Sequence, residues 1–513
     1  MNTPSLVGIT ILSLACFFLT AYAVPHRHYV IYDEYNHMNM ARNIAERNMY
    51  GYCGYYDGSN CEGVQLTHKP AGYHTLLALW MKLAGKSEKN AFIFSAALGA
   101  LSVVAMGLLG FRLFNSSGAG FWASALLAAL PLQLKYSAAT SLELPSFLFL
   151  VLALYATAEA VRSKSRRLIP LVVSLTLFLV NIRMENLCFL FLIPFFFYSF
   201  SKATGDGPKL SVKDTAWLLP TLLFVLPVLL LVVFGTSMTH YQDWTESLLQ
   251  RWKILTFNLP SNLMFWLMPF FHAFALTPLA LYGIWLFENK KHRWMSRYWS
   301  LFFLLFLFGY SAYRFSLFHP PQGDRFALIM YPPVLLFAGY SLAVMSGAAR
   351  GPARRAMTIK TSALAAFLIA SYLINFLFLV KRTDPIENDI RATIPEIART
   401  SSDLPVLACN PSPYLSALNR SIAYTPGTVQ LQLFIHKGIY IAYNPQKRED
   451  NSCADGENLL RNYYDFRLIK SFIGQKDTVR IFLIKKKNSN NDSNMLPGKA
   501  SVREQRSIEN NRK

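Results

Sequence analysis

The chain has 513 residues, of which 53% are hydrophobic and only 15% are charged, and its formal net charge is +21. Soluble domains carry about 25% charged residues, whereas apolar runs long enough to cross a bilayer recur along most of this chain, which excludes a soluble globular protein. The excess of Lys and Arg gathers in short loops between these runs and in the C-terminal tail, so it indicates orientation in a lipid bilayer and excludes nucleic acid as a partner.

The apolar runs predict a mainly α, polytopic helical membrane protein with about 11 transmembrane helices. The spans are predicted at about residues 5–23, 91–111, 119–134, 144–161, 168–182, 187–200, 216–235, 263–287, 298–313, 326–346 and 359–380. The first run has an alternative interpretation as a signal peptide, because Ala21-Tyr22-Ala23 resembles a cleavage site. No Lys or Arg precedes this run and it is long for a signal peptide, so we favour an uncleaved helix.

Basic residues in the short loops predict the orientation, because cytoplasmic loops are enriched in Lys and Arg. With the N-terminus in the cytoplasm, the loops on that side carry Arg162, Lys164, Arg166, Arg167, Lys202, Lys209, Lys213, Lys290, Lys291, Arg293, Arg297, Arg350, Arg354 and Arg355. The opposite short loops carry fewer, namely Lys135, Arg183, Arg251, Lys253, Arg314 and Arg325. We therefore expect the first long loop and the C-terminal region on the external side.

The first external loop, residues 24–90, is too long for a plain connection. Apolar residues at helical spacing over Tyr35–Asn48 and a short apolar stretch at 71–84 predict two interfacial helices that lie in the headgroup layer. A tilted span is the alternative for 71–84, but it would invert every later loop and spoil the bias of basic residues.

Charged residues mark both ends of this loop. Asp33 and Glu34 follow the first span, and His68 and Lys69 precede the apolar stretch at 71–84. A carboxylate at the membrane surface can act as a general base or hold a divalent metal, and the alternative is an acidic pair at the positive end of a helix. His68 and Lys69 are candidates for binding an anionic group, with a lysine that merely snorkels to the surface as the alternative.

Three more charged residues stand at predicted external ends of apolar segments: Glu143, Arg183 and Arg325. Each has a structural alternative, which is a first-turn acid for Glu143, an ion pair with Glu185 for Arg183, and snorkelling for Arg325. In the functional interpretation, Glu143 faces Asp33 as the second carboxylate of a metal or acceptor site. The two arginines would then bind a lipid-linked phosphate.

The six cysteines divide by region. Cys53 and Cys61 lie in the first external loop, Cys409 and Cys453 lie in the C-terminal polar region, and the remaining two lie within apolar spans. Two pairs, each confined to one polar region, predict disulfides in an oxidising compartment. A Cys-Cys-His metal site with His68 is the less favoured alternative.

The composition changes after residue 380. Segments 405–409, 438–443 and 478–485 have strand-like sequences, and a helical run is predicted near Glu457–Phe466. We therefore divide the chain into a transmembrane catalytic domain at 1–380, an external α/β domain at 381–486 and a disordered basic tail at 487–513.

At these residues the chain resembles integral-membrane glycosyltransferases of the GT-C type. It is most similar to the bacterial branch that includes protein O-mannosyltransferases, lipid A aminoarabinose transferases and rhizobial galacturonosyltransferases. The resemblance covers about residues 28–346 and rests on the Asp-Glu pair after the first span, HKPAGYHTLLALWMKLAGKSE, RLFNSSGAGFWASALLAALP, SLELPSFLF, NIRMEN and DRFALIMYPPVLL. The chain departs from the family pattern where Ala71 replaces a proline, Glu143 an aspartate and Phe326 a tyrosine.

The resemblance implies inverting transfer of a single sugar from a polyprenyl-phosphate donor to an acceptor hydroxyl, at the periplasmic face of the bacterial inner membrane. The acceptor would be a glycan, lipid or protein of the cell envelope. The resemblance to the rhizobial enzymes points to lipopolysaccharide among these. Asp33 would be the base, and the cations that stabilise the leaving phosphate would be Lys69, Arg183 and Arg325. A divalent metal ion occurs in relatives, and Glu34 or Glu143 would help to hold one here.

Two other functions compete with this one. A transporter or flippase of a lipid-linked sugar would place ionisable residues at mid-membrane and show internal repeats, whereas here the polar clusters crowd one surface. A polyprenyl-glycan ligase would also use an external site, but the Asp-Glu loop after the first span favours transfer of a single sugar.

Overall fold

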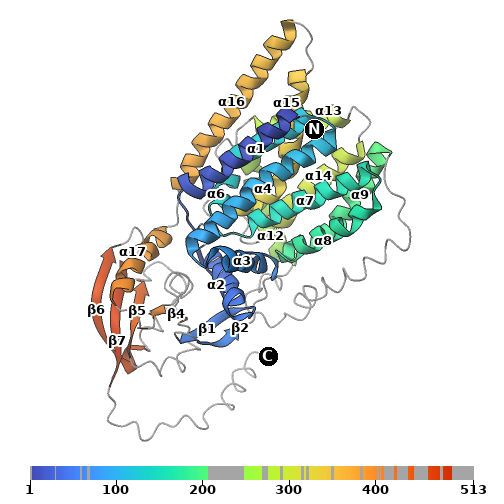
Figure 1. Ribbon diagram of the computed structural model, residues 1–513. Coiled ribbons are helices and arrows are strands. Elements are labelled where there is room, and N and C mark those ends of the chain that lie inside the picture. Colours follow the sequence, from blue (N-terminus) through green and yellow to red (C-terminus); the bar gives the residue numbers. More distant parts are fainter. Residues whose placement is uncertain are drawn as a thin grey trace.

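The computed structural model describes residues 3–28, 31–57, 60–65, 70–205, 248–267, 275–288, 293–313, 317–318, 323–347, 352–381, 385–400, 404, 406–408, 421–423, 437–443, 460–473 and 478–487. Figure 1 shows a bundle of long helices, with shorter helices and two small sheets gathered at one end of it. The predicted fold class, a polytopic helical protein with a small C-terminal α/β unit, is confirmed.

The bundle contains the long apolar helices. These are α1 (Thr3–Phe18), which continues as the π-helix η1 (Leu19–Ala23), α4 (Glu88–Phe114), α5 (Ser117–Ala129), α6 (Pro131–Ser137), α7 (Glu143–Arg162), α8 (Ile169–Val180), α9 (Phe189–Thr204), α12 (Leu248–Leu267), α13 (Leu276–Glu288), α14 (Arg293–Ser311), α15 (Tyr331–Gly347) and α16 (Pro352–Lys381). Three short 3-10 turns, η2 (Arg166–Leu168), η3 (Met184–Cys188) and η6 (Gly323–Met330), lead into α8, α9 and α15.

Six helices of the described part of the chain are long and apolar enough to cross a membrane. A seventh span results if α5 and α6, which meet at a bend of 62°, are counted as one. The bend has a local cause: Leu130 is extended and Pro131 opens α6, since the residue before a proline is disfavoured in a helix. The bend directs α6 and the loop after it toward the end of the bundle where the polar residues lie.

Four of the predicted spans have a different outcome. The spans at 168–182 and 298–313 coincide with α8 and α14, which are not among the helices that are long and apolar enough to cross a membrane. The span at 216–235 lies outside the described residues. The single span at 263–287 is wrong, because α12 ends at Leu267 and α13 begins at Leu276. The hydroxyl of Thr277 donates a 2.8 Å hydrogen bond to the carbonyl of Trp266, so the start of α13 lies against the end of α12. Apolar composition alone does not reveal where one helix ends.

Small residues let the central helices α4, α5 and α15 approach closely. A Cβ atom at Gly120 of α5 would stand 2.5 Å from the carbonyl oxygen of Gly107 on α4. A Cβ atom at Gly339 of α15 would stand 2.7 Å from the backbone nitrogen of Ala123 on α5. Close backbone approach at glycine is the usual way in which helices associate inside a bilayer.

The first long loop folds as two helices and a hairpin. These are α2 (Ile31–Arg47), β1 (Tyr52–Asp57), β2 (Asn60–Gln65) and α3 (Gly72–Ala84). Both predicted helices are present, and the hairpin was not predicted. The N–H of Gly72 donates a 2.7 Å hydrogen bond to the carbonyl of Asn181, and a side chain at position 72 would collide with that carbonyl. This contact fixes the start of α3 beside the turn between α8 and η3.

The C-terminal unit is helix α17 (Pro385–Thr400) with a five-stranded sheet. Its strands are β3 (Val406–Ala408), β4 (Ser421–Ala423), β5 (Lys437–Tyr443), β6 (Tyr464–Ile473) and β7 (Thr478–Lys486), in the spatial order β4-β3-β5-β7-β6. The three predicted strands are present as β3, β5 and β7. The helical run predicted near Glu457–Phe466 is wrong at its C-terminal end, because Tyr464 begins β6, which pairs antiparallel with β7.

The cysteine predictions can be followed in part. Cys16 and Cys188 are free thiols, as expected for cysteines within apolar spans. The side chains of Cys53 and Cys61 and the whole of residues Cys409 and Cys453 lie outside the described part of the structure, so both disulfides stay predictions.

Candidate functional site

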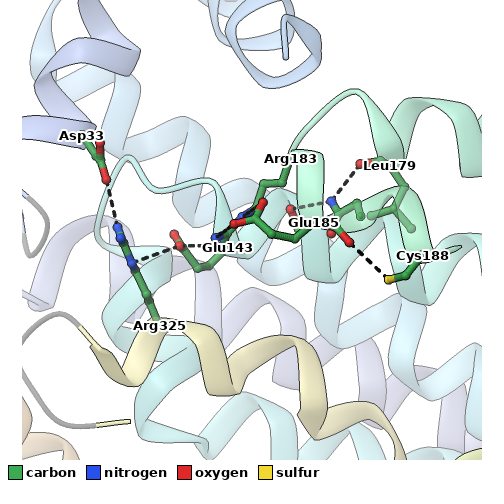
Figure 2. Close-up of polar contacts among 9 residues, drawn as sticks. Asp33, Glu143, Leu179, Arg183, Glu185, Cys188 and Arg325 are labelled. Atoms are coloured by element: carbon green, nitrogen blue, oxygen red, sulfur yellow. Dashed lines mark hydrogen bonds and ion pairs between the residues drawn. The ribbon is translucent and has the colours of Figure 1, made fainter. Parts of the chain in front are cut away.

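Four segments that are distant in sequence bring charged side chains together at one end of the bundle. Asp33 lies in the first turn of α2, Glu143 is the first residue of α7, Arg183 directly precedes η3, and Arg325 lies in η6. Figure 2 shows Arg325 between Asp33 and Glu143, with Arg183 on the other side of Glu143. Asp33, Glu143, Arg183 and Arg325 were all candidates from the sequence.

These side chains form a row of alternating charge. Nη1 of Arg325 is 3.1 Å from Oδ2 of Asp33, and Nε of Arg325 is 3.7 Å from Oε1 of Glu143. The same Glu143 oxygen accepts a 2.8 Å hydrogen bond from Arg183, which also lies 3.0 Å from Glu185. We call Asp33, Arg325, Glu143, Arg183 and Glu185 the charged row. The contact between Arg183 and Glu185, expected as the structural alternative, coexists with the contact to Glu143.

Accessibility differs along the charged row. The side chain of Asp33 is 39% exposed, whereas those of Glu143, Arg183 and Arg325 are 6%, 11% and 19% exposed. Both guanidinium groups also lie over the ring of Phe326, at 5.4 Å for Arg183 and 4.8 Å for Arg325. The shared ring holds the two cations near each other. An accessible carboxylate stands at each end of the row, Asp33 beside Arg325 and Glu185, which is 40% exposed, beside Arg183. This arrangement suits an anion next to a base.

Glu34, the neighbour of Asp33, has other partners. It is fully buried, and its Oε2 accepts a 3.0 Å hydrogen bond from the backbone N–H of Thr140 and lies 3.0 Å from Nδ1 of His28. The other nitrogen of His28 lies 2.5 Å from Oε1 of Glu88, at the start of α4. We call His28, Glu34 and Glu88 the histidine bridge. It ties α2 to α4 and to the loop before α7.

The histidine bridge changes the protonation of its imidazole. Complete burial by itself would lower the pKa of His28, but its hydrogen bonds to Glu34 and Glu88 and the charges of these carboxylates outweigh burial and raise the pKa to about 9. A protonated ring donates from both nitrogens, which matches two carboxylate partners.

His68 and Lys69 lie outside the described residues, so their roles stay predictions. The structure describes the chain again from Pro70, and Pro70 and Ala71 directly precede α3. The N–H of Gly72 binds the carbonyl of Asn181, two residues before Arg183.

The described contacts do not fit a divalent ion shared by Glu34 and Glu143. Oε1 of Glu143 already faces two guanidinium groups, whose positive charges oppose a cation at the same oxygen. The Glu34 carboxylate is enclosed by Thr140 and His28. In the part of the chain that the structure describes, no cluster of three or more His, Cys, Asp or Glu is arranged for a metal.

Sequence reasoning missed the groups behind the charged row. Lys135 and Tyr136 on α6 both bind Asp324, which directly precedes Arg325, and Thr140 and His28 bind Glu34. One available signal was a lysine in an apolar stretch, at Lys135, because charge there is costly unless it is paired. The sequence could not name its partner.

Comparisons with known proteins address the family and the fold. A family model described as "Family of unknown function (DUF6541)" matches residues 3–401. None of the curated protein sequences is similar enough to this chain to count as a relative.

Solved structures match over nearly the whole chain. ArnT from Cupriavidus metallidurans bound to undecaprenyl phosphate has a TM-score of 0.61 and 11% identity, and the match covers 94% of this chain and 98% of that chain. The archaeal oligosaccharyltransferase AglB from Archaeoglobus fulgidus, in complex with an inhibitory peptide and a dolichol-phosphate, has a TM-score of 0.55 and 12% identity over 96% and 75% of the two chains. Both have the GT-C type of fold, so the fold implied by the sequence resemblance is confirmed.

Proposed function

Because the chain belongs to the DUF6541 family and has the fold of GT-C glycosyltransferases, we propose that it is a membrane glycosyltransferase. It moves a single sugar from a polyprenyl-phosphate donor to an acceptor hydroxyl of a cell-envelope glycan, lipid or protein. The observation that carries the proposal is the charged row, in which the accessible carboxylate of Asp33 contacts Arg325 and two arginines converge on Glu143.

The donor class follows from the chemistry of two adjacent guanidinium groups. Arginine binds phosphate oxygens through two parallel N–H donors, and Arg183 and Arg325 both lie over Phe326. The ArnT structure carries undecaprenyl phosphate and the AglB structure carries dolichol-phosphate, which supports a lipid phosphate as the donor head. Lys69 would add a third cation.

The reaction is an in-line displacement at the anomeric carbon. The acceptor oxygen forms a bond to this carbon as the bond to the phosphate oxygen breaks, so the configuration inverts. The acceptor proton goes to Asp33, and the polyprenyl phosphate leaves with the bonding electron pair, stabilised by Arg183 and Arg325. A general base typically contributes about 10²–10⁴-fold, and one contact to a leaving anion about 3–4 kcal/mol.

Binding of the donor also prepares the base. In the described arrangement the guanidinium of Arg325 is paired with Asp33. An arriving phosphate competes with this carboxylate for the guanidinium, and the competition frees Asp33 to receive a proton. We assign Glu34 to the support of α2, because the histidine bridge occupies its carboxylate.

The test compares cell-envelope glycans and glycolipids by mass spectrometry in a strain that lacks the gene. Complementation with the wild-type chain should restore one missing sugar, whereas Asp33→Asn should not, since an amide cannot accept the proton. The expected loss in turnover is about 10²–10⁴-fold. The matched control is Glu46→Gln on the same helix, where the carboxylate pairs with Lys86 and the change should leave transfer intact.

Two outcomes would contradict the proposal. Full complementation by Asp33→Asn removes Asp33 as the base. Accumulation of an intact lipid-linked sugar in the deletion strain, cleared equally by both proteins, identifies a transporter.

A further inference from the structure

A buried ion pair lies directly behind the charged row. Nζ of Lys135 is 2.9 Å and 2.7 Å from the two carboxylate oxygens of Asp324, and the hydroxyl of Tyr136 donates a 2.6 Å hydrogen bond to the same carboxylate. Asp324 is fully buried and Lys135 is 1% exposed. We call Lys135, Tyr136 and Asp324 the α6 anchor.

The α6 anchor is continuous with the site through the chain. Asp324 is bonded to Arg325, so a displacement of its carboxylate moves the residue that contacts Asp33 and Glu143. The backbone at Gly323 passes close to the carbonyl of Leu317, so a side chain at this position would collide with that carbonyl. The start of η6 is therefore restrained directly before Arg325, at Gly323 and at Asp324.

The same segment of chain also supports the other half of the charged row. Five residues after Lys135, the N–H of Thr140 binds Glu34, the neighbour of Asp33. Three residues further, Glu143 contacts Arg325 and Arg183. Residues 135–143 thus contact the chain neighbours of both proposed functional residues: Lys135 binds Asp324, next to Arg325, and Thr140 binds Glu34, next to Asp33.

We propose that Lys135 is a positioning residue: its ion pair with Asp324 sets the place of the Arg325 guanidinium relative to Asp33. This inference rests on the proposed function, because it assigns Arg325 to the lipid phosphate. Removing one partner of a buried ion pair is strongly destabilising, whereas replacing both by apolar residues is often neutral or stabilising. The pair is therefore explained better by the geometry that it fixes than by stability.

The test is a double-mutant cycle on the full-length purified protein, with equilibrium binding of labelled undecaprenyl phosphate as the readout. The replacement of Lys135→Met with Asp324→Leu also includes Tyr136→Phe, because the Tyr136 hydroxyl would otherwise lose its buried acceptor. With all three members of the α6 anchor apolar, the melting temperature should stay near the wild-type value. This replacement should weaken binding about tenfold in the wild-type background and less than about twofold in an Arg325→Ala background, since contacting residues couple and independent ones add. The matched control replaces the Arg112–Glu159 pair by Met and Leu, and it should leave binding unchanged.

Several outcomes would overturn the inference. Equal losses in both backgrounds, or unchanged affinity in the wild-type background, show that Lys135 does not act through Arg325. If this replacement does not fold, the same cycle is measured with Tyr136→Phe alone, which is a smaller change. Equal losses of binding affinity in the wild-type and Arg325→Ala backgrounds would again overturn the inference. Wild-type protein that binds no undecaprenyl phosphate overturns the proposed donor and, with it, the inference, whereas binding without coupling overturns the inference alone.

Discussion

Buried charges in this protein are neutralised by direct neighbours. Arg183 contacts two glutamates, Arg325 contacts an aspartate and a glutamate, and Lys135 contacts both oxygens of Asp324. A charge taken out of water is costly, and a partner with further hydrogen bonds offsets that cost. At the scale of residues, the polar end of the bundle is therefore a set of mutually dependent ion pairs. Substitution of one member leaves the charge of the other buried without a counter-ion.

The histidine bridge gives a prediction about pH. Because the pKa of His28 rises from 6.5 to about 9 in the folded protein, its stabilising effect is full below pH 6.5 and is lost as the pH rises through about 9. A shift of this size corresponds to about 3 kcal/mol of unfolding free energy. Thermal unfolding of the purified protein between pH 6 and pH 10 measures it.

The variant His28→Gln should flatten this pH dependence, because the group that titrates is gone. His26→Gln is the matched control, since His26 contacts the ring of Phe92 and the carbonyl of Thr20. A wild-type melting temperature that does not fall between pH 6.5 and pH 9 would contradict a charged His28.

At the scale of elements, tight helix contacts at glycine fix the bundle that carries the site. Helix α5 packs against α4 at Gly120 and against α15 at Gly339. Helix α15 continues from η6, which carries Arg325, and α6 continues from α5 and carries Lys135. A shift between α5 and α15 would therefore separate Lys135 from Asp324. The helix contacts at Gly120 and Gly339 thus determine how the residues of the α6 anchor and the charged row lie relative to each other.

Gly339→Ala should lower the unfolding free energy by about 1–3 kcal/mol, because the added methyl group would overlap the backbone of Ala123. Gly309→Ala is the matched control, since a Cβ atom at this helical position meets open space. The control should be neutral or stabilising by up to about 1 kcal/mol, from helix propensity alone. Thermal or denaturant unfolding in detergent compares the two, and equal effects would contradict the packing argument.

At the scale of the whole molecule, the bundle has two different ends. Helices α4 and α7 both begin near the polar residues, at Glu88 and Glu143, and their C-terminal ends are joined by the ion pair between Arg112 and Glu159. The shorter helices, the hairpin and the C-terminal sheet lie at the end with the charged row (Figure 1). If basic loops mark the cytoplasm, this end faces the periplasm.

Reporter fusions test this orientation. Alkaline phosphatase fused after Lys513 should be active and a green fluorescent protein should not fluoresce there, because the C-terminal region would be periplasmic. Insertion of the same reporters after Lys164, between α7 and α8, should give the reverse result. Active phosphatase after Lys164 would contradict the orientation derived from the basic residues.

Much of the fold could be predicted from local sequence patterns. The lengths of the apolar runs predicted a polytopic bundle, and the spacing over Tyr35–Asn48 and 71–84 predicted α2 and α3. Strand β6 was missed, because the helical run predicted near Glu457–Phe466 was extended past residue 463, whereas Tyr464 already pairs with β7. The break between α12 and α13 was missed because the run was judged by its hydrophobicity alone. Its two prolines, Pro269 after the end of α12 and Pro278 in the first turn of α13, were the available signal.

The sequence by itself determined that this is a polytopic membrane protein, and it singled out Asp33, Glu143, Arg183 and Arg325, which the structure brings to one end of the bundle. The lengths of the apolar runs and the positions of charged residues at their ends are enough for these. Only the tertiary structure decided which charges meet: Arg325 contacts Asp33 across 292 positions, and Lys135 contacts Asp324 across 189. Such contacts depend on the bend at Pro131 and on glycine contacts between helices, which fix distances in space that spacing along one chain does not encode.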